Sequence, residues 1–276
     1  RALAVSVPYL PGQRVLPYTV STAQSAGWIW DINLASRRGV GYVYSSQHQS
    51  ADDAHAVLRA YLGQSWPEEA SVRPITMRVG RSERLWEHNC VAIGLAGGFV
   101  EPLESTGIYL IEHGVRCLID HWPTQGLSGV LRNGYNRMMS DAYDEVVRFV
   151  LMHYVASSRR DSAFWRDVTA PRALPGGFDE QLAIWRAKLP SPIDVRVMSG
   201  KVFGHQSYLA ILYGLGWFKG LPSPYVSADR AGLQRHMAAR LKEYQRVVEG
   251  LPSHEAFLSH ASTPPPMVGQ ISPRAR

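Results

Sequence analysis

The sequence lacks several features that would assign it to a common class of protein. It holds only two cysteines, Cys90 and Cys117, and no Cys-x-x-C spacing, so neither a zinc ribbon nor a redox dithiol is expected. So few thiols suit a reducing compartment, and we expect a cytoplasmic protein. No run of eighteen apolar residues occurs, so no membrane association is expected.

Motifs for other chemistries are also missing. There is no Gly-x-Ser-x-Gly elbow of a serine hydrolase, and the ten histidines show no ligand spacing for a metal. The Gly-x-Gly-x-x-Gly fingerprint of a dinucleotide site is absent as well. The net charge of +6 would suit an anionic partner, but the basic residues form no stripe, and no nucleic-acid partner is expected.

The composition is that of an ordinary globular protein. Hydrophobic residues make up 45% and charged residues 19% of 276 residues, which is enough for one large domain or two small ones. The chain is rich in flat side chains, with 8 Trp and 13 Tyr. Such residues suit a site that binds rings and equally suit a core, so composition leaves both open.

Apolar periodicity predicts a sheet in the front part of the chain. Residues 1–46 are expected to be extended, including Arg14–Val20. Within Gly27–Leu34 large apolar residues alternate, which indicates a half-buried strand, and Val40–Ser45 is expected to return beside it. A helix is predicted to start at the Ser50 cap and to run to about residue 62.

Two further strands are predicted before the chain becomes helical, at Pro74–Gly80 and Leu85–Gly94. A long helix is expected from about Ser105 to His121. The clearest helical patterns after it are Tyr135–Ser157, Ser162–Asp167, Asp179–Lys188 and Arg230–Glu249.

The expected fold is therefore α+β, with a front antiparallel sheet followed by a mostly helical region. We place the sheet-rich part at residues 1–125 and the helical, substrate-side part at 126–262. Residues 263–276, with three consecutive prolines and no periodicity, are expected to form a disordered tail.

The segment Ile93–Ile108 carries the clearest chemical signal. A strand enters a Gly-Gly turn, and Ser-Thr-Gly leads into a helix whose first N–H groups are unpaired, which predicts an anion site beside Thr106 and Gly107. Glu104 directly precedes this site and could act as a general base. A plain helix cap, with the glutamates favouring the helix dipole, explains the same residues equally well.

Two stretches resemble the flavin-dependent tryptophan halogenases. Gly98-Phe-Val-Glu-Pro-Leu-Glu-Ser-Thr-Gly107 is similar to a signature of that family, and Gly27-Trp-Ile-Trp-Asp-Ile32 resembles its Trp-x-Trp-x-Ile-Pro motif, with Asn33 in place of the proline. Shorter matches follow in order along residues 1 to about 260, at Pro17–Thr22, Gly41–Ser46, His153-Tyr154, Arg160-Asp161, Phe164-Trp165 and Pro252–Phe257. The resemblance implies part of a flavin-monooxygenase-like fold.

The resemblance also implies a reaction. Members use FAD, reduced by a separate flavin reductase, and oxygen to form a flavin hydroperoxide, which a halide ion attacks to give hypohalous acid. The expected outcome is chlorination or bromination of a small electron-rich aromatic such as tryptophan or another indole. A homodimer is left open.

Individual roles follow from the matched positions. Glu104 would be the essential glutamate and Ser105 would lie between the flavin and substrate sites, so both are taken as catalytic. Thr106 and Gly107 would bind the halide. Contact with the cofactor is expected at Gly97, Gly98 and Ile108.

Two further roles have a structural alternative. Trp28 and Trp30 would disfavour ordinary monooxygenation, but they also suit the core of a strand. Tyr208 would contact the substrate, but it also suits an inward helix face with Leu212 and Tyr213.

The chain departs from the family in ways that limit the prediction. Neither the dinucleotide fingerprint nor the family's active lysine has a match, so we expect the C-terminal half of a longer protein, inactive by itself. A flavin-dependent aromatic monooxygenase and a non-catalytic binding module remain as alternatives.

Overall fold

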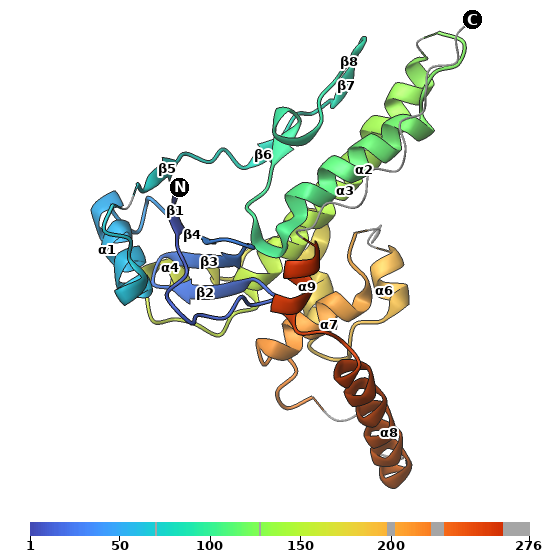
Figure 1. Ribbon diagram of the computed structural model, residues 1–276. Helices are drawn as coiled ribbons and strands as arrows, with labels where there is room; N and C mark the ends of the chain where they lie inside the picture. The colour runs from blue at the N-terminus through green and yellow to red at the C-terminus, as the bar shows by residue number, and fades with distance from the viewer. Residues whose placement is uncertain (70, 127, 198–201, 222–228, 262–276) are drawn as a thin grey trace, which may run out of the picture.

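An antiparallel sheet forms the front of the molecule. The computed structural model describes residues 1–69, 71–126, 128–197, 202–221 and 229–261. The sheet has the strand order β2-β3-β4-β1-β5 (Figure 1). Its strands are β1 (Ala2–Val7), β2 (Val20–Gln24), β3 (Gly27–Asn33), β4 (Arg38–Tyr44) and β5 (Arg73–Ile75).

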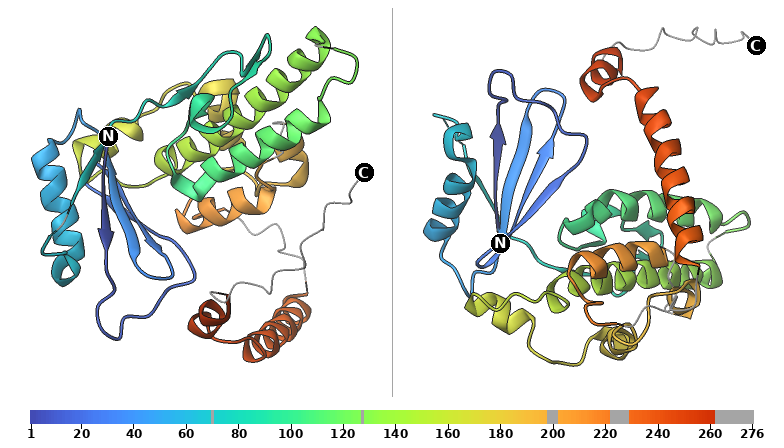
Figure 2. Two further views of the ribbon diagram at one scale, coloured as in Figure 1. Left: turned by 45° about the horizontal axis from the view of Figure 1, so that its top comes forward. Right: turned by 90° about the horizontal axis from the view of Figure 1, so that it is seen from below.

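The alternation in β3 sends its side chains to two different cores. Ile29 is fully buried and packs with residues of β1, β4 and helix α1 (Ala51–Leu62), which covers one face of the sheet (Figure 2). The helix begins as predicted, because Ser50 Oγ accepts a hydrogen bond of 3.1 Å from the Asp53 backbone N–H. Trp28 and Trp30 lie on the other face, toward the rest of the chain.

Two long helices complete the core on the tryptophan face. Helix α2 (Thr106–Asp120) lies beside helix α3 (Gly129–Val155) (Figure 1). Their buried residues, including Leu110 and Tyr135, form one cluster with Trp28 of the sheet and Leu103 of the loop before α2. The loop that carries the predicted chemistry is therefore held between the sheet and both helices.

Three of the later helices, α5 (Phe178–Ile184), α6 (Pro192–Val197) and α7 (His205–Gly214), build a second core around the end of α3. Trp185 and Tyr208 are fully buried there against Phe149. No helix in the described part of the chain is long and apolar enough to span a bilayer. Outside this core, α4 (Ala163–Val168) packs with Ala26 beside the sheet, α8 (Arg230–Glu249) has no buried residue, and α9 (His254–Ala261) follows it.

The structure confirms an α+β fold but corrects several strands. Arg14–Val20 is not a strand, because β2 starts only at its last residue. The predicted strands Pro74–Gly80 and Leu85–Gly94 are also wrong: this region has only short pieces, namely β5, β6 (Gly80–Arg81), β7 (Trp86–Glu87), β8 (Cys90–Val91) and β9 (Gly98–Phe99).

A side chain takes the place of a strand partner in this region. Asn136 Oδ1 on α3 accepts hydrogen bonds from the backbone N–H groups of Leu85 (2.8 Å) and Trp86 (2.7 Å), and its Nδ2 donates to the Trp86 carbonyl (2.9 Å). The apolar pattern therefore marked the burial of Leu85 and Trp86 but did not mark a long strand. Short 3₁₀ turns occur at Gly63–Ser65, Gly94–Ala96, Leu103–Ser105 and Pro175–Gly177.

Helix α3 starts at Gly129, earlier than predicted, and runs unbroken to Val155. The predicted disordered tail, residues 263–276, lies outside the described residues.

Because Gly41 has no side chain, the indole ring of Trp30 can lie against it. These residues lie directly opposite each other on β4 and β3, and a Cβ at Gly41 would come within 2.1 Å of the Trp30 ring. We expect Gly41→Ala to lower the free energy of unfolding by about 1–3 kcal/mol, because the indole must move. Denaturant unfolding followed by fluorescence measures this. Gly39→Ala on the same strand is the control, since a Cβ there meets nothing within 4 Å. Equal losses in both variants would contradict the assignment.

Candidate active site

The loop before α2 has a strained backbone at two successive residues. Glu104 (φ 66°, ψ 14°) and Ser105 (φ 55°, ψ 28°) both adopt the left-handed conformation. This conformation costs a non-glycine residue roughly 1–2 kcal/mol. Strain of this kind persists only where surrounding contacts enforce it, and it gathers at functional sites. Leu103, buried in the main core, is one such anchor.

Glu104 is held by a histidine at the end of α3. The Nε2 atom of His153 lies 3.2 Å from Glu104 Oε1, and the side chains are 15% and 38% exposed, respectively. On its other side, His153 Nδ1 lies 2.8 Å from the Phe149 carbonyl oxygen. The hydrogen bond with His153 lowers the pKa of Glu104, against the opposing effect of partial burial. Glu104 therefore favours its ionised form.

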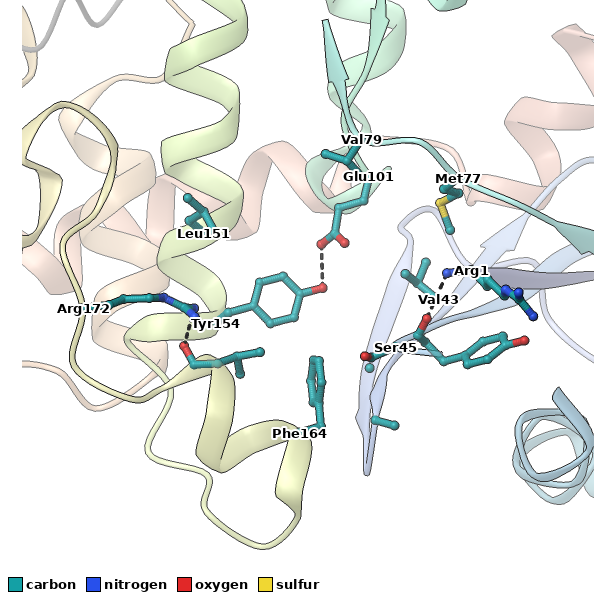
Figure 3. Close-up of a pocket in the computed structure, with 14 residues that line it drawn as sticks. Arg1, Val43, Ser45, Met77, Val79, Glu101, Leu151, Tyr154, Phe164 and Arg172 are labelled. Carbon is teal, nitrogen blue, oxygen red and sulfur yellow. Dashed lines mark hydrogen bonds between the residues drawn. The ribbon is translucent and has the colours of Figure 1, made fainter. Parts of the chain in front are cut away.

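Glu101, one turn earlier in the loop, experiences the opposite environment. The hydroxyl of Tyr154 donates a hydrogen bond of 2.6 Å to Glu101 Oε1, as Figure 3 shows. Burial raises the pKa of Glu101, although that hydrogen bond and the nearby Trp28 indole partly offset it. Burial and the carboxylate together raise the pKa of Tyr154 as well. Trp28 Nε1 is itself buried and makes no hydrogen bond of good geometry to a described residue.

The two glutamates are thus separated in their acid–base character. Consecutive residues of α3, His153 and Tyr154, contact one carboxyl each, and both contacts lower a carboxyl pKa. The net shifts are opposite because burial outweighs the hydrogen bond at Glu101, whereas the hydrogen bond outweighs burial at Glu104. Pairs of carboxyls in environments of this kind often divide into an acid and a base. Glu104 is the one suited to accept a proton.

Glu104 and Ser105 open into a pocket of about 360 Å³ with the tryptophan pair. The rings of Trp28 and Trp30 meet edge to face, with their centroids 6.2 Å apart. The sequence motifs, more than seventy residues apart, therefore share one cavity. Its other lining residues are Thr19, Ser21, Ile32 and Pro102. Glu101 and Tyr154 face a separate cavity of about 300 Å³, drawn in Figure 3.

The start of α2 fits a small anion and leaves room for a ring. Its first N–H groups have no partner within the helix, and Thr106 is buried with a hydroxyl that has no hydrogen-bond partner among the described residues. A Cβ at Gly107 would meet nothing within 4 Å, and Ile108 is 77% exposed. The residues expected to contact a halide and a flavin thus present a polar end and an open apolar surface, which fits both groups.

Three other predicted site residues lie in tighter surroundings. A Cβ at Gly97 would clash with Leu85, and one at Gly98 would clash with Arg81, so the chain's own packing requires both glycines. Their contact with a cofactor stays a prediction. Tyr208 is fully buried on α7, and its ring centroid lies 4.9 Å from that of Phe149. Phe149 packs in turn on His153, the partner of Glu104, so Tyr208 is separated from Glu104 by two side chains. Substrate contact at Tyr208 also stays a prediction.

Sequence reasoning did not find the roles of His153, Glu101 and Tyr154. His153-Tyr154 was only one of the shorter family matches, and Glu101 was explained by the helix dipole. The Glu-x-x-Glu spacing was the available signal, since it places two carboxyls on one short turn. Nothing local to α3 indicated a partner about fifty residues earlier. No cluster suited to a metal occurs in the part of the chain that the structure describes.

An antiparallel sheet followed by a mostly helical region is also the architecture of the corresponding part of halogenase structures. The family profile described as tryptophan halogenase matches residues 1–229. The chain belongs to this family.

Similar proteins support the assignment over most of the chain. Tryptophan 6-halogenase SttH of Streptomyces toxytricini is 39% identical over 268 residues, which are 94% of this chain and 49% of the relative. Tryptophan 7-halogenase RebH of Lentzea aerocolonigenes is 34% identical over 275 residues, 93% of this chain and 51% of RebH.

The crystal structure of SttH superposes with a TM-score of 0.86 at 38% identity, covering 95% of this chain and 50% of SttH. BrvH, a flavin-dependent halogenase from Brevundimonas sp. BAL3, superposes with a TM-score of 0.80 at 36% identity, covering 94% of this chain and 51% of BrvH. The chain thus spans about half the length of the curated relatives it matches, and the matched part is their C-terminal half.

The strain at Ser105 can be tested by glycine substitution. We expect Ser105→Gly to raise the free energy of unfolding by about 1 kcal/mol, because glycine adopts positive φ without steric cost. Ser105→Ala keeps the strain and serves as the control. Denaturant unfolding measures both. A Ser105→Gly variant no more stable than Ser105→Ala would show that the backbone is not strained there.

The buried Glu101 predicts a pH-dependent difference in stability. A carboxyl whose pKa is raised in the folded state stabilises the protein at low pH, and this contribution is lost as pH rises through the folded pKa. We therefore expect Glu101→Gln, which stays neutral, to be more stable than the parent at pH 7. The difference should shrink as pH falls toward 4. Urea unfolding across this range measures it, and a gap that widens on acidification would refute the raised pKa.

Proposed function

We propose that this protein carries the substrate side of a flavin-dependent halogenase, which chlorinates or brominates tryptophan or another electron-rich indole. The observation that carries the proposal is the pocket that joins ionised Glu104 to the Trp28 and Trp30 pair, directly before the anion-binding start of α2. The relatives named above support the same chemistry by their names.

Each part of the site contributes to one requirement of aromatic halogenation. The N–H groups at the start of α2, with Thr106 and Gly107, would hold the halide. When bound, reduced FAD with oxygen would supply the oxidising equivalent that makes the halogen electrophilic. Trp28 and Trp30 line the pocket with apolar rings. They would limit the access of water, so that an electrophilic halogen meets the aromatic substrate rather than solvent.

Glu104 would remove the proton that the ring must lose. Once the halogen is attached, the ring carbon carries both halogen and hydrogen, and a base must take the hydrogen as a proton to restore aromaticity. Glu104 is ionised, 38% exposed and opens into the pocket, so it can accept that proton directly. Ser105, held beside it in the left-handed conformation, fixes the direction of the loop toward α2.

Substitution of Glu104 tests the proposal. The protein is expressed from its complete reading frame and supplied with FAD, a flavin reductase, oxygen, chloride or bromide, and a panel of indoles that includes tryptophan. We expect halogenated product, and a loss of about 10²–10⁴ in kcat for Glu104→Gln, the usual contribution of a positioned general base. Mass spectrometry of the products measures it.

Glu112→Gln is the matched control, since Glu112 lies on α2 in an exposed pair with Arg116, outside the pocket. It should retain turnover. Halogenated product at equal rates from Glu104→Gln would remove Glu104 from the mechanism. Hydroxylated product that forms without halide would replace halogenation with aromatic monooxygenation.

A further inference from the structure

We propose that His153 is a positioning residue for Glu104: it shares one proton with the carboxylate and thereby holds it ionised and aimed into the pocket. The inference rests on the proposed function for its catalytic consequence. Its geometric basis is the pair of contacts that His153 makes from α3, Nε2 to Glu104 and Nδ1 to the Phe149 carbonyl.

The Phe149 contact determines which ring nitrogen carries a proton. A carbonyl oxygen can only accept, so the 2.8 Å contact requires Nδ1 to be the donor. A neutral His153 then has a bare lone pair at Nε2. Because an ionised carboxylate also offers only lone pairs, neutral imidazole and ionised Glu104 would repel each other at 3.2 Å.

The contact therefore needs one shared proton. It can lie on Glu104, which makes a neutral pair, or on Nε2, which makes an imidazolium beside a carboxylate. The hydrogen bond from His153 lowers the pKa of Glu104, which favours the second arrangement. In that state, Glu104 is a base whose carboxylate is oriented by a charged donor fixed to the helix.

No other group described around His153 and Glu104 is placed to take the proton that they share. Glu101, on the same loop, also interacts electrostatically with His153, and this interaction lowers the pKa of Glu101 against the larger effect of burial. Tyr154, next to His153, directs its hydroxyl to Glu101. The Phe149 ring packs edge to face on the imidazole, with centroids 5.2 Å apart, and fixes its plane. The strands contribute the neutral side chains of the pocket.

After the carbon–halogen bond forms, the ring C–H bond breaks and its electron pair returns to the ring. The proton passes to Glu104, which becomes a carboxylic acid beside the His153 imidazolium. One proton then leaves to solvent by way of the 15% exposed imidazole or the open carboxyl, and the singly protonated pair is restored.

The tautomer and the Glu104 pKa can be measured without turnover. Ring-¹⁵N histidine labelling of the protein from its complete reading frame should show that neutral His153 carries its proton on Nδ1. In His153→Gln, ¹³C NMR of the glutamate carboxyls should show a higher pKa for Glu104 than in the parent. A proton on Nε2, or an unchanged Glu104 pKa, would overturn the proposal whether or not the protein is a halogenase.

The pH profile of halogenation provides the second readout. In the parent, kcat should be bell-shaped, because only the singly protonated pair is active. His153→Gln should lose the alkaline limb, since its amide donates at every pH, and its acid limb should move to higher pH. His153→Leu should lower kcat by about 10–100-fold, with partial rescue by His153→Gln. A parent-like bell in His153→Gln would overturn the proposal.

His121→Gln is the matched control. His121 Nδ1 also contacts the carbonyl four residues earlier, that of Cys117, at 2.9 Å, but its Nε2 faces the Gly134 backbone rather than a carboxylate. This variant should keep the bell-shaped pH profile of kcat and the parent pKa of Glu104. If the parent makes no halogenated product while the NMR results hold, the positioning of Glu104 is supported and the proposed function is the part that fails.

Discussion

The hold of helix α3 on the loop before α2 is the interaction on which the site depends. His153 and Tyr154 are consecutive residues, so they point in different directions from the helix, and each meets one glutamate of the same short turn. A fully formed helix is rigid enough to hold both at once. Because the deeper burial of Glu101 raises its pKa while the His153 contact lowers that of Glu104, this arrangement sets both the position of the loop and the acid–base character of its two carboxyls.

The sheet supplies the opposite wall of the pocket. Gly41 allows Trp30 to lie across β4, and the edge of Trp28 packs against it. The sheet is fixed from behind by α1, whose contacts involve only the other face. The two walls of the pocket are joined by the core cluster that contains Trp28 of the sheet and Leu103 of the loop, which keeps the shape of the pocket fixed.

Sequence patterns predicted the elements that are regular and missed those that depend on distant partners. The period-two alternation at Trp28 and Trp30 and the cap at Ser50 are local signals, and the structure confirms the strand and the helix they predicted. Leu85 and Trp86 are apolar because they are buried, but Trp86 belongs only to the two-residue strand β7, and Asn136 binds its backbone N–H, so the pattern could not reveal how short the strand is. The Glu104 neighbourhood was predicted from the loop itself. Its partner His153 could not be, because nothing in a helical sequence marks a contact with a residue forty-nine positions away.

The strained backbone at Glu104 and Ser105 also positions the carboxylate of Glu104. Two successive left-handed residues cost energy that unconstrained residues would avoid by relaxing. Leu103 holds the turn from the buried side, and His153 holds it from the other through Glu104. The conformation turns the chain sharply into α2, so that the carboxylate of Glu104 and the positive end of the helix become neighbours. The proposed base and the proposed anion site, which have opposite electrostatic character, are thus kept adjacent by the chain itself.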